Sequence, residues 1–430
     1  MEKSHDPREF IRGIQQILIN NTIRIGFLFG AGSSMAAPLT DEDGQHLKDA
    51  RNKVKPLIPG VRVMTDEILQ SIKDTKFKKA LESIKAELEE NEKDEKKRAF
   101  AFMLENIISS IDQKIKVVAS DTLCGLDKNG LKELRSLFQQ KIKSLVEVHK
   151  NPKINIKESA RLHSNFARWI KYASRKNAIE VFTTNYDYLF EIGYESQSLP
   201  YFDGFVGGYN PFFDPISVEN DQMIPKWTRL WKLHGSLGWG YDEDEKRIIR
   251  SREISDDRIV IYPSLLKYDD SRKQPYSSYI ERLSSFLKKD DGVLFICGYS
   301  FGDEHINDTI INALAQSRST TVIALVFDKE LNEDSISVKV GMNSNQFVIC
   351  GNKSALIGGI FGAWKLKREP AKHDFEFIDQ FFDRDGPEPE SATGIGDEIE
   401  LPTGELKLVD FGEFVRFLIE LSYPMEVKYE

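Results

Sequence analysis

Residues 23–34 read IRIGFLFGAGSS, an apolar run that ends in a turn of glycine, alanine and serine. A short apolar and β-branched run stopped by small residues is typical of a buried parallel strand followed by a tight turn. Further strands are predicted at 178–183, 230–233, 259–262, 293–297, 321–327 and 347–350, and helices at 7–19, 159–174, 275–288 and 304–316. Because apolar strands alternate with helices, the sequence predicts an α/β fold with a doubly wound, Rossmann-like parallel sheet.

The composition changes after the first strand and turn. Residues 41–157 are rich in Lys, Glu, Leu and Ile at helical spacing, with the clearest helices expected at 77–90, 98–117 and 131–149. We therefore expect a helical insertion at 41–157, placed within an α/β unit formed by residues 1–40 and 158–380. Residues 381–430 are expected to form an acidic tail, with a Pro- and Gly-rich linker and a candidate docking helix at 411–421.

Bulk properties narrow the classes of function. The 430-residue chain has a formal net charge of -9 and a pI of about 5.5, so nucleic-acid binding is not expected as its primary role. The three cysteines (Cys124, Cys297 and Cys350) form no CxxC pair, which argues against a disulfide framework or a cysteine zinc site and favours a reducing compartment. No stretch approaches the ~18 apolar residues of a membrane span, and no apolar signal segment is seen, so we expect a cytoplasmic protein.

The first motif that bears on chemistry is the turn formed by Gly30, Ala31, Gly32 and Ser33. Glycines let a backbone turn tightly and approach a diphosphate closely, and the next helix would offer unpaired N–H groups. The third glycine of the GxGxxG pattern is missing, so the turn is either a phosphate site or a purely structural turn.

The second motif, residues 182–187 (FTTNYD), also follows a strand directly. Thr184, Asn185 and Asp187 would face the crevice in which doubly wound sheets bind ligands. Asn185 can hold a water molecule or a ribose hydroxyl, and Asp187 can orient its neighbours. The alternative is that Asp187 only caps the next helix.

Two later strands are followed by similar segments. His234, beside a glycine, can exchange a proton near neutral pH or orient a ribose hydroxyl, or it can be a structural histidine. Gly298 and Ser300 could approach a nucleotide, and Asp303 could do so or cap the following helix.

The order of these segments resembles the sirtuin superfamily, whose members show GAGxS, TxNxD, a catalytic HG and a late Gly/Ser turn. The resemblance covers about residues 20–40 and 178–365. It implies that Asn185, His234 and Asp187 are catalytic residues. It also implies that the nucleotide is bound by Gly30, Ala31, Gly32, Ser33, Thr184, Gly298, Ser300 and Asp303.

The chain departs from protein-deacylating sirtuins in two respects. It lacks their four-cysteine zinc module, and it carries the helical insertion at 41–157. Together with residues 263–267 (PSLLK), these departures make it similar to bacterial sirtuin-like defence proteins that consume NAD⁺. The implied reaction is hydrolysis of NAD⁺ to ADP-ribose and nicotinamide, with NAD⁺ as substrate and no metal.

Two other functions stay open. One is an NAD-dependent deacylase or ADP-ribosyltransferase on the same site, and the other is a non-catalytic NAD⁺ or ADP-ribose sensor subunit. The layout resembles stand-alone sirtuin-like subunits that work with a HerA-type DNA-translocating ATPase in antiphage defence, which implies such a partner. Because amphipathic helices of the insertion must bury their apolar stripes, we also expect a homo-oligomer.

Overall fold

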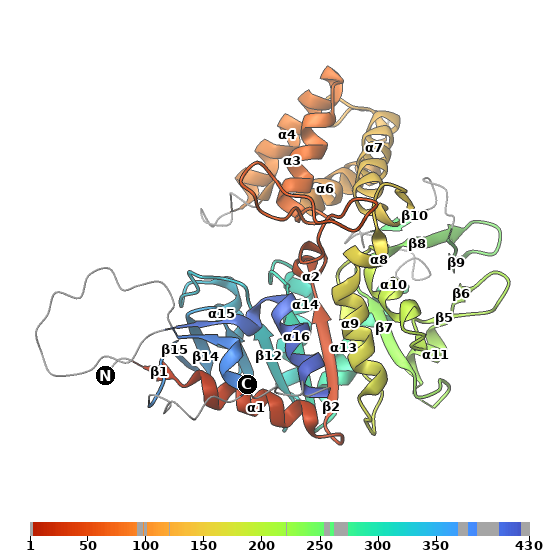
Figure 1. The fold of residues 1–430 in the computed structure, drawn as a ribbon. Coiled ribbons are helices and arrows are strands. Elements are labelled where there is room, and N and C mark those ends of the chain that lie inside the picture. The colour runs from red at the N-terminus through yellow and green to blue at the C-terminus, as the bar shows by residue number, and fades with distance from the viewer. Residues whose placement is uncertain are drawn as a thin grey trace, which may run out of the picture.

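The computed structural model describes residues 3–92, 98, 101–119, 121–220, 222–252, 259–261, 274–368, 377–384 and 404–422. Ten strands form the main sheet in the order β1-β15-β14-β13-β12-β11-β2-β3-β7-β4 (Figure 1). They are β1 (Ser4–His5), β2 (Arg24–Phe29), β3 (Glu180–Thr183), β4 (Tyr201–Phe202), β7 (Thr228–Lys232), β11 (Gly292–Cys297), β12 (Thr321–Leu325), β13 (Phe347–Cys350), β14 (Ser354–Ile357) and β15 (Ile360–Trp364). Only β14 runs antiparallel to its neighbours, so the predicted α/β fold with a mostly parallel sheet is confirmed.

Strand β2 lies in the middle of this sheet and is apolar on both faces. Ile25, Phe27 and Phe29 join one hydrophobic cluster, and Leu28 joins the other. A Cβ on Gly26 would lie 2.7 Å from the ring of Phe286, so the glycine makes room for a helix that crosses this face. This two-sided burial explains why the strand reads as a continuous apolar run.

Helices cover both faces of the sheet. One face is covered by α1 (Pro7–Ile19), α9 (Arg161–Tyr172), α10 (Leu189–Ser196) and α16 (Phe411–Ser422). The other is covered by α13 (Tyr276–Lys288), α14 (Glu304–Leu314) and α15 (Ile336–Gly341). Each fully buried large apolar side chain in these layers contributes about 1.5–3 kcal/mol, so the two-sided packing fixes the sheet on which the site is built.

A second, antiparallel sheet was not predicted. It has the order β10-β8-β9-β6-β5 and consists of β5 (Phe205–Val206), β6 (Phe212–Phe213), β8 (Gly235–Asp242), β9 (Arg247–Arg250) and β10 (Ile259–Ile261). The strand expected at 259–262 therefore belongs to this sheet and not to the parallel one, because it pairs with β8. Residue 262 and the segment 263–267 lie outside the described residues.

Residues 37–160, between β2 and α9, form a helical unit, drawn in orange to yellow above the main sheet in Figure 1. It contains α3 (Val61–Ser71), α4 (Thr75–Asn91), α6 (Leu104–Val117) and α7 (Lys128–Val146), followed by the short α8 (Ile156–Ser159). The helix expected at 98–117 is interrupted: Arg98 and Ala101 are helical, the chain is extended at Met103, and α6 begins at Leu104. The apolar stripes of these helices pack on one another within the chain. Self-association was expected because these stripes needed a partner, so it stays a prediction that this argument no longer supports.

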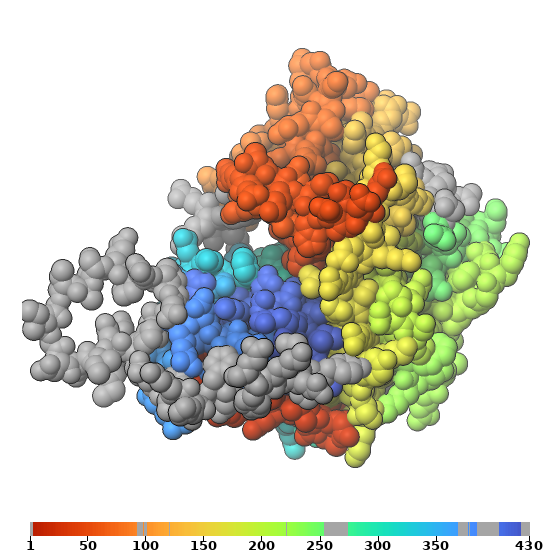
Figure 2. All heavy atoms as spheres, viewed as in Figure 1, coloured from red at the N-terminus to blue at the C-terminus, as the bar shows by residue number. Residues whose placement is uncertain are grey.

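The helical unit rests on the edge of the main sheet to which β2 points (Figures 1 and 2). Its hydrophobic cluster includes Tyr186, Leu189 and Leu237 from the α/β part of the chain, so the two parts share a core. No helix in the described ranges is long and apolar enough to cross a membrane. The segment 385–400, most of the expected linker, lies outside those ranges.

Candidate active site

The four segments predicted at strand ends meet at one edge of the main sheet. They follow β2, β3, β7 and β11, which lie side by side and parallel in the order β11-β2-β3-β7. Because the carboxyl ends of parallel strands share one edge, residues far apart in the sequence come together there. The helical unit lies over the same edge, so this is where a ligand would be enclosed.

The glycine-rich turn is locked to the late turn at 298–303. Gly30 begins α2 (Ala31–Met35), and its N–H donates to the carbonyl of Cys297 over 3.2 Å. The N–H of Gly32 donates to the carbonyl of Gly298 over 2.9 Å. A Cβ on Gly32 would lie 2.5 Å from the Cα of Gly298. The glycines therefore allow two backbones to touch, and these two N–H groups are already used within the protein.

Asn185 ties the second motif to the glycine-rich turn. Its Nδ2 lies 3.0 Å from the carbonyl oxygen of Gly30, 3.0 Å from Ser33 Oγ and 2.8 Å from Ser34 Oγ. Its backbone N–H donates to Thr183 Oγ1 over 3.0 Å. The side chain is buried and held on one side, so its carbonyl group is the part that can be presented to a ligand.

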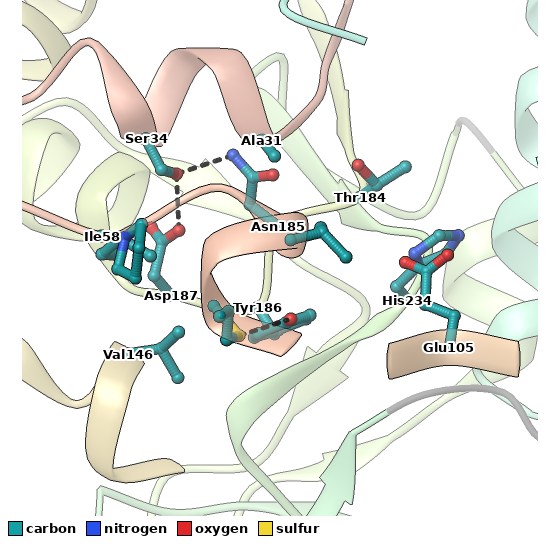
Figure 3. A pocket seen from close by; sticks show the side chains of 13 residues that line it. Ala31, Ser34, Ile58, Glu105, Val146, Thr184, Asn185, Tyr186, Asp187 and His234 are labelled. Atoms are coloured by element: carbon teal, nitrogen blue, oxygen red, sulfur yellow. Dashed lines mark hydrogen bonds between the residues drawn. The ribbon is translucent and has the colours of Figure 1, made fainter. Parts of the chain in front are cut away.

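Asp187 serves both of the roles considered for it. Its Oδ1 accepts from the N–H of Leu189, the first residue of α10, over 2.9 Å, and its Oδ2 accepts from Ser34 Oγ over 2.6 Å. The backbone carbonyl of Asp187 accepts from Lys232 Nζ, which also pairs with Glu191 over 2.6 Å. Asp187 therefore holds Ser34, and through it Asn185, in place (Figure 3).

His234 is paired with Asp303 across the edge. The imidazole Nε2 lies 2.9 Å from Asp303 Oδ2, while Asp303 Oδ1 accepts from the N–H of Ile306 and caps α14. Burial alone lowers the pKa of His234, but the hydrogen bond to Asp303 and the charges of Glu105 and Asp303 outweigh it, so this pKa is raised. Burial raises the pKa of Asp303, but the hydrogen bond and charge of His234 reverse this effect, so the pKa is lowered. Both shifts favour an imidazolium–carboxylate pair.

A cavity of about 50 Å³ lies between the sheet edge and the helical unit (Figure 3). Its sheet side is formed by Ala31, Ser34, Thr184, Asn185, Tyr186, Asp187 and His234, and its other side by Ile58, Pro59, Val61, Met64, Glu105 and Val146. Ligand pockets typically measure roughly 300–1,000 Å³, so the cavity is closed to a dinucleotide in this conformation.

Some predicted site residues lie outside the cavity wall. Gly30, Gly32 and Ser33 lie behind it and support Asn185, and Gly298 packs against them. Ser300 is exposed on the turn and does not line the cavity. Ser34 belongs to the predicted glycine-rich segment, but no separate role in the site was predicted for it, and every residue supplied by the helical unit was missed.

Nothing in the described ranges forms a cluster of three or more His, Cys, Asp or Glu side chains that could hold a metal ion. The three cysteines are free, with Cys297 and Cys350 buried in β11 and β13. Burial raises the pKa of both of these thiols, so they are poor nucleophiles.

Comparison with known proteins gives one family match. Residues 179–344 match the model of the SIR2-like domain. The match runs from the start of β3 to just beyond α15, and it includes Asn185, His234 and Asp303 but neither the glycine-rich turn nor the helical unit. No curated protein matches the chain. The chain therefore contains a SIR2-like domain, a family whose members use NAD.

Proposed function

We propose that the protein hydrolyses NAD⁺ to ADP-ribose and nicotinamide. The observation that carries this proposal is the meeting of Asn185 and His234 in one pocket at the ends of neighbouring parallel strands of a SIR2-like domain. Both side chains are buried and held by fixed partners, which is the preorganisation that a polar transition state requires. A pure binding module would need neither arrangement.

The chemistry makes specific demands on this pocket. Nicotinamide leaves with the electron pair of the bond to C1′ of the ribose, and positive charge develops on the sugar. We propose that Asn185 and His234 hold the water molecule that attacks C1′, and that Asp187 keeps Asn185 in place through Ser34. Excluding bulk water protects the reactive sugar until that one molecule is in position.

The size of the cavity implies a movement. NAD⁺ cannot enter a space of about 50 Å³, so we expect the helical unit to move away from the sheet edge when the substrate binds. Its walls on the two sides come from separate parts of the chain, so opening would break the contacts of Tyr186, Leu189 and Leu237 with the helical unit and leave the strands of the sheet paired.

The layout of the chain further supports a HerA-type ATPase as partner and a role in antiphage defence, which we include in the proposal on resemblance alone. An unregulated NAD⁺ hydrolase would exhaust the NAD⁺ of its host, so an activating partner is expected. Such a partner would control the opening of the helical unit.

The test is NAD⁺ consumption by the purified chain, alone and with a HerA-type ATPase, in the wild type, Asn185→Ala and His234→Ala. Asn312→Ala and His46→Ala are matched controls, because both side chains are exposed and lie outside the cavity wall. We expect release of ADP-ribose and nicotinamide without any acyl peptide, lost by at least about 100-fold in the two site variants and kept in the controls. Release only in the presence of acyl-lysine peptide would establish a deacylase instead, and binding without turnover would establish a sensor.

A further inference from the structure

The helical unit brings one carboxylate into the pocket, that of Glu105. This residue lies in the first turn of α6 and lines the cavity together with Asn185 and His234. Its side chain extends toward the imidazole of His234 in Figure 3. The two groups interact electrostatically, and Glu105 also acts on the nearby Tyr299.

The position of Glu105 is fixed by its neighbours. Leu104 is fully buried in the core of the helical unit, and its N–H donates to Thr65 Oγ1 of α3 over 3.2 Å. The Glu105 side chain itself is exposed at the mouth of the cavity, and among the described residues no group donates a hydrogen bond to it. The fold therefore places beside the pocket a carboxylate that faces His234 and accepts no hydrogen bond from the described residues.

The other ionisable groups of the cavity wall are already engaged. Both oxygens of Asp187 accept hydrogen bonds, from Ser34 and from Leu189. The Nε2 of His234 lies 2.9 Å from Asp303 Oδ2. Asp187 is thus committed to structure, and the Nε2 of His234 is taken up by Asp303. Among the described carboxylates of the cavity wall, Glu105 is the one that accepts no hydrogen bond, so it is available to take a proton from water.

We propose that Glu105 is a catalytic residue of the NAD⁺ hydrolysis, an inference that rests on the proposed function. As the bond from C1′ to nicotinamide breaks, its electron pair leaves with the neutral nicotinamide, and the Glu105 carboxylate stabilises the positive charge on the ribose. The oxygen of water then bonds to C1′, and its released proton passes to Glu105 and from there to solvent. Atoms and charge balance, because NAD⁺ and water give ADP-ribose, nicotinamide and one proton.

This assignment makes the helical unit part of the catalytic machinery. The movement that admits NAD⁺ withdraws Glu105 from His234, and closure returns it to the ribose. The reaction would then proceed only in the closed complex, so substrate binding and completion of the site are coupled.

The test compares Glu105→Gln, which keeps the shape and removes the charge, with Glu105→Asp, which keeps the charge. Glu82→Gln on α4 is the matched control, because Glu82 is also an exposed carboxylate of the helical unit but does not line the cavity. Nicotinamide release is measured against NAD⁺ concentration and pH, with the melting temperature of each variant as a check of folding.

We expect Glu105→Gln to lower kcat about tenfold or more with little change in KM, because the charge acts on the transition state. Glu105→Asp should retain part of the activity, and Glu82→Gln should match the wild type. The charged groups that face His234 are Asp303 and Glu105.

The possible failures are distinguishable. If the wild type releases no nicotinamide under any condition, the proposed function is wrong and this inference falls with it. If the wild type is active and a folded Glu105→Gln variant matches its kcat at every pH, only the role of Glu105 is wrong. An NMR titration of the histidines gives a second readout: the pKa of His234 should fall in Glu105→Gln and stay unchanged in Glu82→Gln.

Discussion

Replacing Gly32 by alanine tests the contact on which the site is built. A Cβ at this position would lie 2.5 Å from the Cα of Gly298, 3.1 Å from its carbonyl oxygen and 3.2 Å from its carbonyl carbon. All three are backbone atoms, so no change of side-chain conformation can relieve the clash. Ordinary contact needs about 3.5 Å, so the two turns must separate by about 1 Å.

That separation has a cost that can be worked out from the geometry. Moving the turns apart by about 1 Å breaks the 2.9 Å bond from the Gly32 N–H to the Gly298 carbonyl, at about 1–3 kcal/mol. Overpacking adds about 1–3 kcal/mol, and the better helix propensity of alanine returns up to about 1 kcal/mol. We expect a net loss of about 2–4 kcal/mol and, for a chain of 430 residues, a melting temperature roughly 2–4 °C lower.

The assay is urea and thermal unfolding followed by circular dichroism, with Gly13→Ala as the control. Gly13 lies inside α1, and a Cβ there would meet nothing within 4 Å, so this variant should gain about 0.5–1 kcal/mol. The same chemical change thus has opposite expected signs at the two positions. A Gly32→Ala protein as stable as the wild type would show that the two turns are not locked together.

Three further predictions concern buried charges. Burial lowers the pKa of His163 to about 4, against about 6.5 in the unfolded chain, so unfolding takes up a proton and stability falls as the pH drops through this window. Between pH 7 and pH 5 this loss should be about 2 kcal/mol, and His163→Leu should remove it in urea titrations at the two pH values. Glu180→Ala should cost about 3–5 kcal/mol in the same assay, because it removes the buried carboxylate that accepts two 2.7 Å bonds from Arg282; a loss below about 1 kcal/mol would contradict this. Asp303→Asn should lower the pKa of His234 in an NMR titration; since a raised pKa stabilises the fold only below that pKa, the variant should lose more stability at pH 6 than at pH 8.

The parallel sheet could be predicted because its strands are buried on both faces and therefore read as apolar runs. The antiparallel sheet could not. Its longest strand, Gly235–Asp242, has the sequence GSLGWGYD, which is rich in glycine, a residue that is depleted in strands. It is extended because of a tertiary contact: a Cβ at Gly238 would lie 2.0 Å from the Tyr188 hydroxyl, so only glycine fits there. Such a contact leaves no periodic signal in the sequence.

The candidate site likewise has one side that the sequence predicts and one side that it does not. The sheet side was predictable, since polar residues that directly follow parallel strands must gather at one edge. The helical side was not, because hydrophobic spacing shows which stripe of a helix is buried but not which end faces a pocket. Glu105 therefore read as one surface carboxylate among many. The supporting role of Gly30 and Ser33 behind Asn185 also became visible only in three dimensions.

The place of β2 in the middle of the sheet has a consequence for synthesis on the ribosome. Gly26 pairs with Glu180 on one side and with Leu294 on the other, and both partners are made long after β2 has emerged. At about 5–20 residues per second, β11 follows β2 by roughly 10–60 s. Until β3 emerges the apolar strand has two open edges, and the edge toward β11 stays open for the whole interval, which is a risk for aggregation. The helical unit, whose contacts are more local, can fold in this interval. In the nascent chain the helices that cover the site would then form before the main sheet is complete.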